Sequence, residues 1–132
     1  MKFKTFKQNK LVRDKIIELM QSNGSKMYWF TLQDKDFIKQ LKIKLIEEAQ
    51  EVLHSNTNNI IDELADVMEL VDYLAQLHGI NHEQLQQAKN NKREEKGGYE
   101  KRIFLTFAEH PKDSPQERYC LADPEKYPEV KL

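Results

Sequence analysis

The stretch KLIEEAQEVLHSNTNNIIDELADVMELVDY, residues 44–73, decides the fold class of this chain. On both sides of the polar run at 55–58, apolar residues recur at every third or fourth position, which is the spacing of an amphipathic helix. The polar run itself is rich in Ser and Asn, residues that favour turns. The pattern therefore predicts two long helices that lie antiparallel and are joined by a short turn.

Glycine residues mark where the helical segments end, because each follows a stretch with helical spacing. The predicted elements, in chain order, are a helix at 10–22, a strand at 27–32, a helix capped by Asp34 or Asp36 that reaches about Leu53, a helix at 59–78 that ends at Gly79, a helix capped by Asn81 that reaches about Glu95, a strand at 99–107 and an irregular tail from 109. We expect one domain over residues 1–132, with its core at about 9–107. The expected fold is mainly α, a helical bundle with a small two-stranded β element.

Composition limits the partners and the assembly. The chain has 132 residues and a net charge of −1, so its overall charge favours neither nucleic acid nor an acidic membrane surface. We expect no binding to either. The mean hydropathy is low, at −0.80, and small domains bury a smaller fraction of their surface than large ones. A homodimer or higher homo-oligomer is therefore expected.

Features of secreted and membrane proteins are missing from the sequence. Cys120 is the single cysteine, which leaves no pair for an intrachain disulfide or a zinc site. The first ten residues lack the apolar run of a signal peptide, and no apolar stretch is long enough to cross a bilayer. We expect a cytoplasmic protein.

Two pairs of carboxylates on consecutive helices are the main candidates for chemistry. Glu48-x-x-Glu51 lies on the first helix of the decisive stretch and Glu63-x-x-Asp66 on the second. Residues three apart share a helix face, so an antiparallel pair of helices brings the four carboxylates face to face. Glu63 falls within the apolar stripe of its helix, where an uncompensated charge is costly. Mg²⁺ relieves such repulsion and prefers oxygen ligands, so the pattern favours a magnesium site, with Mn²⁺ as an alternative.

A structural explanation of the same carboxylates stays open. A single E-x-x-E on a helix is usually surface charge that pairs with nearby cations. Two such pairs on consecutive helices, one of them within an apolar stripe, weaken that explanation without removing it. The pattern alone leaves metal binding and solvated charge about equally supported.

The carboxylate motif resembles the metal signature of the all-α NTP pyrophosphatase superfamily, which includes MazG-like proteins, dimeric dUTPases and phosphoribosyl-ATP pyrophosphohydrolases. The segment NKLVRDKI at 9–16 is similar to the N-terminal block of a compact MazG-like branch, related to phosphoribosyl-ATP pyrophosphohydrolase. The segment GGYEKRI at 97–103 is similar to the closing block of that branch. The resemblance covers about residues 9–107. It implies a helical bundle that is completed across subunits.

The resemblance also implies an activity: hydrolysis of a nucleoside triphosphate, canonical or non-canonical, to the monophosphate and pyrophosphate. Metal ligation would fall to Glu48, Glu51, Glu63 and Asp66. A metal-activated water would attack, oriented or deprotonated by Glu47 or Glu48. Recognition of the base and sugar, and a house-cleaning or a biosynthetic role, stay open.

Basic residues near the carboxylates are candidate phosphate ligands, because phosphoryl transfer needs positive charge beside the metal. Arg13 and Lys92 are preferred, since the resemblance places them in blocks that flank the carboxylates. Lys10 and Lys96 are further candidates. For any one of them, a solvated surface charge is the alternative. A non-catalytic nucleotide-binding or sensing module and a structural helical-bundle interaction protein are the rival functions.

Overall fold

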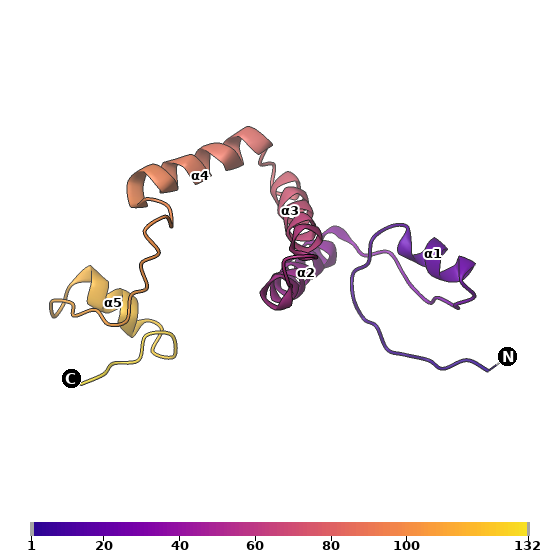
Figure 1. Ribbon diagram of the computed structural model, residues 1–132, viewed down its shortest axis with the longest axis horizontal. Coiled ribbons are helices and arrows are strands. Elements are labelled where there is room, and N and C mark those ends of the chain that lie inside the picture. The colour runs from indigo at the N-terminus through magenta and orange to yellow at the C-terminus, as the bar shows by residue number, and fades with distance from the viewer. Residues whose placement is uncertain (1, 132) are drawn as a thin grey trace. The chain divides into compact units, whose positions relative to one another are not determined.

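The computed structural model of the chain describes residues 2–131, which form five α-helices and no strand (Figure 1). The helices are α1 (Ile16–Ser22), α2 (Asp34–His54), α3 (Ile60–Leu77), α4 (His82–Lys96) and α5 (Pro115–Leu121). The predicted mainly α fold is confirmed, and the bounds predicted for α2, α3 and α4 lie within about two residues of those observed. The predicted β element is wrong.

The chain divides into two compact units, one that ends at Glu95 and one that begins at Lys96. The first unit holds α1, α2, α3 and nearly all of α4, and the second holds α5. The boundary falls within the range 9–107 that we expected to form the core. The single domain stays a prediction.

Helices α2 and α3 pack side by side as a helical hairpin, and they are the one pair of helices in close contact within residues 2–131 (Figure 1). Leu41 of α2 is 2% exposed and Leu70 of α3 is 9% exposed, and these two side chains form the buried core. The connection is held by its own polar groups: the Asn56 backbone N–H donates to Asn59 Oδ1 at 2.9 Å, and the Asn58 N–H donates to Asn56 Oδ1 at 2.9 Å. These bonds fix the short turn that brings the two helices together.

Helix α3 ends, and helix α4 begins, close to the residues that the sequence predicted. Gly79 adopts φ +70, in the left-handed region that glycine enters at no steric cost, and α3 stops just before it. Asn81 Oδ1 accepts from the Gln84 N–H at 2.8 Å, while the Asn81 N–H donates to Gln84 Oε1 at 2.9 Å. This reciprocal pair is a capping box, so Asn81 caps α4 as expected.

Capping of α2 by an aspartate is a wrong prediction. The residue at the N-cap is Gln33, and no side chain caps the helix. Asp34 and Asp36 lie instead in the first turn, where a negative charge interacts favourably with the helix dipole.

Helix α1 is shorter than the predicted helix at 10–22, since it begins at Ile16. The residues before it are in contact with the hairpin. Arg13 forms ion pairs with two carboxylates of α3, and Lys10 and Leu11 line a pocket together with α2. These tertiary contacts replace a first helical turn whose intrinsic stability is small.

The strands predicted at 27–32 and 99–107 are absent from the described part of the chain. Both segments are irregular and rich in exposed apolar side chains, with Phe30 at 81% and Phe104 at 89% exposed. The second begins with a turn, in which the Arg102 N–H donates to the Tyr99 carbonyl oxygen at 3.0 Å. A strand needs a partner to satisfy its backbone donors and acceptors. The two segments lie in different units, and neither pairs with another segment.

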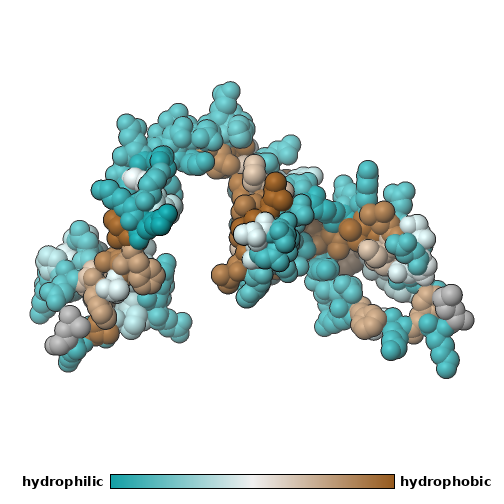
Figure 2. Space-filling model, in the orientation of Figure 1, coloured by the Kyte–Doolittle hydropathy of each residue, from teal (hydrophilic) through white to brown (hydrophobic). Residues whose placement is uncertain are grey.

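Apolar side chains remain exposed on the hairpin, away from its core. Ile61, Leu64 and Met68 follow one another on the same face of α3 and are all exposed. Figure 2 shows apolar side chains at the surface over α3. These side chains add nothing to the buried core, which consists of Leu41 and Leu70.

The second unit contains a helix that was not predicted, because an irregular tail was expected from residue 109. Ser114 Oγ accepts from the Glu117 N–H at 3.1 Å and caps α5, which has proline at its first position. The rings of Tyr119 and Tyr127 lie 5.6 Å apart. A cap, a proline and an aromatic contact thus order part of the tail.

Among the helices of residues 2–131, none combines the length and the apolar content that a membrane span requires.

Candidate metal centre

Three carboxylates from the two helices of the hairpin converge at one place. Glu48 extends from α2, and Glu63 and Asp66 extend from successive turns of α3. One carboxylate oxygen of each lies within 4.8 Å of the other two, and all three residues are half-buried. The i, i+3 spacing on α3 and the antiparallel hairpin are what bring the three together, as the sequence predicted.

Glu63 is the carboxylate that is most affected by its surroundings. Desolvation is the main cause that raises its pKa, and the negative charges of Glu51, Glu48 and Asp66 raise it further. Glu51 therefore lies close enough to act on Glu63, although it is outside the group of three oxygens within 4.8 Å. Within the described residues, Glu63 takes part in no ion pair.

Two cations flank this cluster and link it to carboxylates outside it. Lys44 Nζ lies 3.2 Å from Glu47 and 3.5 Å from Glu48, both on its own helix. On the other side, Arg13 reaches from the segment before α1 to Asp66, at 2.7 Å, and to Glu69, at 2.5 Å.

The charge around the cluster stays negative. Lys44 pairs with Glu47 and Glu48, and Arg13 pairs with Asp66 and Glu69, whereas Glu63 pairs with neither cation. Five carboxylates against two cations leave an excess of negative charge where the helices meet. An additional cation at this point would lower the repulsion.

The donor set fits a hard divalent cation. All three groups offer carboxylate oxygen and no nitrogen or sulfur, which suits Mg²⁺ or Mn²⁺ rather than zinc or copper. Mg²⁺ holds its ligands at about 2.1 Å, so opposite ligands lie about 4.2 Å apart. The three carboxylate oxygens lie within 4.8 Å of one another, which is close to that separation.

Of the other predicted site residues, some lie near the carboxylate cluster and some do not. Glu47 lies beside the cluster and pairs with Lys44, and its side chain is 40% exposed. Lys10 lines a pocket together with residues of α2, whereas Arg13 forms ion pairs with carboxylates. Lys92 lies on α4, which is not packed on α2 or α3 within the described chain, so helix packing does not bring it to the cluster. Lys96 is the first residue of the second unit.

Lys44 and Glu69 were not among the predicted site residues. The sequence did contain a signal for Lys44, because it precedes Glu47 and Glu48 by three and four positions, the spacing of helical ion pairs. Glu69 had no such signal, since its partner Arg13 lies 56 positions earlier and only the folded chain brings them together.

Comparisons with family models, with curated proteins and with solved structures find no match to this chain.

Proposed function

We propose that this protein is a Mg²⁺-dependent nucleoside triphosphate pyrophosphohydrolase of the MazG-like kind. The observation that carries the proposal is the convergence of Glu48, Glu63 and Asp66 within 4.8 Å, at the meeting of two helices with an excess of negative charge. The order of the carboxylates along the chain is the one that the motif of that superfamily has. Mn²⁺ is an alternative metal with the same ligand preference.

In the proposed reaction, water attacks the α-phosphorus and the bond from that phosphorus to the bridging oxygen breaks. The products are the nucleoside monophosphate and pyrophosphate. Glu48, Glu63 and Asp66 would hold the metal, with Glu51 next to them as the fourth candidate ligand. When bound, the metal lowers the pKa of water and neutralises charge on the phosphoryl oxygens. A glutamate on α2, Glu47 or Glu48, orients the water and accepts its proton.

The test is a screen of nucleoside triphosphates, canonical and damaged, with Mg²⁺ and detection of released pyrophosphate. We expect stoichiometric monophosphate and pyrophosphate from at least one substrate, and no release when EDTA replaces Mg²⁺. A Glu63→Gln variant should release none. Release of inorganic phosphate in place of pyrophosphate would assign a different bond cleavage. No release from any substrate would reject the hydrolase and leave a binding or sensing module.

A structural role has its own support in the ion pairs of Lys44 and Arg13. Each of these cations ties one carboxylate of the cluster to a second carboxylate, as in a surface network that stabilises a hairpin. On this second candidate function the protein is a helical interaction module that binds no metal. A melting temperature that does not change with Mg²⁺ would favour it.

We also propose that the chain works as a homodimer or larger homo-oligomer. Only Leu41 and Leu70 are buried among the apolar side chains of residues 2–131, and one face of α3 carries exposed apolar residues along its length. Contact between two such faces buries both, and a helical bundle forms across the subunits.

A further inference from the structure

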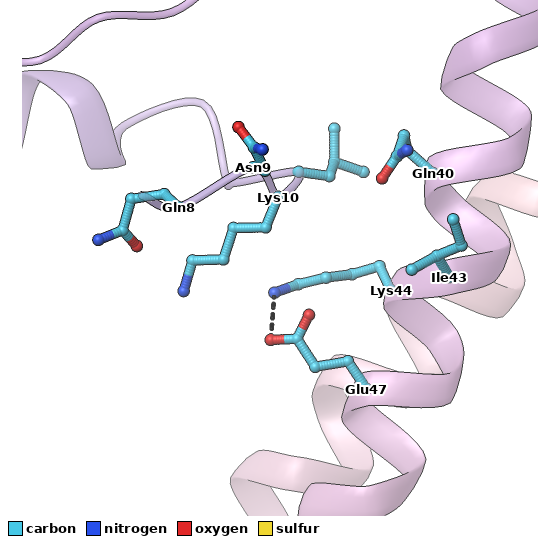
Figure 3. A pocket seen from close by; sticks show the side chains of 8 residues that line it. Gln8, Asn9, Lys10, Gln40, Ile43, Lys44 and Glu47 are labelled. Atoms are coloured by element: carbon cyan, nitrogen blue, oxygen red, sulfur yellow. Dashed lines mark hydrogen bonds and ion pairs between the residues drawn. The ribbon is translucent and has the colours of Figure 1, made fainter. Parts of the chain in front are cut away.

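A pocket of about 240 Å³ opens between α2 and the segment before α1 (Figure 3). The lining residues come from these two places: Gln8, Asn9, Lys10, Leu11, Gln40, Ile43, Lys44 and Glu47. Asn9 adopts φ +44, a left-handed conformation that asparagine tolerates better than most residues.

Two lysines and one carboxylate are the charged groups of the pocket lining. Figure 3 shows the side chains of Lys10 and Lys44 extending into the same opening, with Glu47 next to the Lys44 ammonium. Lys10 makes no ion pair with any of residues 2–131. Amide side chains supply further donors at the rim. Because Lys44 is shared by Glu47 and Glu48, Lys10 is the lining cation without an ion pair to residues 2–131. The ammonium groups and the amide N–H groups together can donate to an anion with several acceptor oxygens.

Lys44 connects this pocket to the carboxylate cluster. Its ammonium lies 3.2 Å from Glu47, which lines the pocket, and 3.5 Å from Glu48, which belongs to the cluster. The side chain is only 19% exposed, so it is held in place between the two carboxylates. An anion in the pocket and a cation in the cluster would thus be neighbours.

We propose that this pocket binds a pyrophosphate group, with Lys44 and Lys10 as its cationic ligands. The inference rests on the proposed function, because the pocket then receives the two phosphates that leave. Attack in line with the breaking bond puts the water on the side opposite the leaving group. Glu47, which lines the pocket, then lies on the leaving-group side.

The test measures binding of inorganic pyrophosphate to the full chain by calorimetry, with and without Mg²⁺. Wild type should bind, and Lys44→Met and Lys10→Met should each bind at least about tenfold more weakly, as expected for the loss of a charged hydrogen bond. Lys42→Met is the matched control, since Lys42 is an exposed lysine of the same helix and does not line the pocket. Circular dichroism reports on the fold of each variant, and Lys10, outside any helix, can be replaced without disturbing α2.

The possible outcomes separate the two proposals. Absence of pyrophosphate binding by wild type, or equal affinity in wild type and in both variants, would overturn the pocket assignment. Nucleotide hydrolysis that continues in that case would leave the proposed function standing. Pyrophosphate binding that depends on Lys44 and Lys10, without hydrolysis of any nucleotide, would support the anion site and reject the hydrolase.

Discussion

Replacement of Glu63 by Gln tests the metal centre most directly. The change keeps the size of the side chain and removes one of the three carboxylates that lie within 4.8 Å of one another. Loss of a residue that only supports a metal ligand typically lowers metal affinity 10- to 100-fold. We therefore expect Glu63→Gln to weaken Mg²⁺ binding at least about tenfold.

The weaker Mg²⁺ binding of the variant can be measured as a smaller rise of its melting temperature on addition of Mg²⁺. Mg²⁺ at 100 times its Kd stabilises a folded protein by about 2.7 kcal/mol. A chain of 132 residues has an unfolding entropy of about 0.28 kcal/mol/K. Mg²⁺ should therefore raise the melting temperature of wild type by about 10 °C. At the same Mg²⁺ concentration a tenfold weaker site gives about 1.4 kcal/mol, or about 5 °C. Asp72→Asn, at an exposed carboxylate of α3, is the control and should keep the full shift.

Without metal, Glu63→Gln should be at least as stable as wild type, whereas with Mg²⁺ wild type should be the more stable of the two. The pKa of Glu63 is raised in the folded state, mainly by desolvation, so folding favours its protonated form. The folded state then binds more protons than the unfolded state, and the stability of wild type falls as pH rises above 4.5, the ordinary pKa of the group. Glu63→Gln lacks this loss and should be at least as stable as wild type at pH 7 in EDTA. The difference should vanish as pH is lowered toward 4.

Two results would refute this reasoning. A Glu63→Gln protein that keeps the full Mg²⁺ shift would remove the residue from the site. A metal-free variant that is less stable than wild type at pH 7 would show that Glu63 has a stabilising partner in the fold.

Three further predictions concern the hairpin and its surroundings. Arg13→Met should lower the free energy of unfolding by up to about 1 kcal/mol in low salt, because its ion pairs are largely exposed; urea denaturation should show a smaller difference in 1 M NaCl, and an equal loss at both salt concentrations would contradict the assignment. Sedimentation should find an oligomer at micromolar concentration that Met68→Glu shifts toward monomer, since Met68 is 66% exposed on an apolar face; a monomeric wild type would reject the proposed assembly. Asn81→Ala should cost about 1 kcal/mol through loss of the capping box, measured by thermal unfolding, and an unchanged stability would mean that α4 needs no cap.

The parts of the fold that depend on local patterns could be predicted from the sequence. The spacing of apolar residues, the polar connection at 55–58 and the break at Gly79 are local, and they gave α2 and α3 with nearly the observed bounds. The strands failed because a strand depends on a partner. Aromatic and β-branched residues favour an extended chain, but nothing in the order of residues says which segment pairs with it.

The contrast between local patterns and long-range contacts also explains which features of the site could be predicted from the sequence. Glu48, Glu63 and Asp66 could be placed together because a hairpin of known register follows from the helices and the turn. Arg13 as a phosphate ligand stays a prediction, but its ion pairs with two carboxylates of α3, more than 50 positions away, were not predicted. Long-range ion pairs of this kind depend on how the N-terminal segment meets the hairpin, and local periodicity does not contain that information.

The positions of the cations around the carboxylate cluster bear on two explanations of it, a metal centre and a structural network of ion pairs. In a structural network each acidic side chain gains from a cation nearby, and the flanking carboxylates follow this rule through Lys44 and Arg13. Glu63 does not, because no cation of residues 2–131 pairs with it, and desolvation together with the neighbouring negative charges raises its pKa. Hairpin stability alone would be served better by a neutral residue at this position. A carboxylate there lowers the energy of the protein only when a further cation joins the cluster, so the response of stability to Mg²⁺ at Glu63 is where the two explanations predict opposite results.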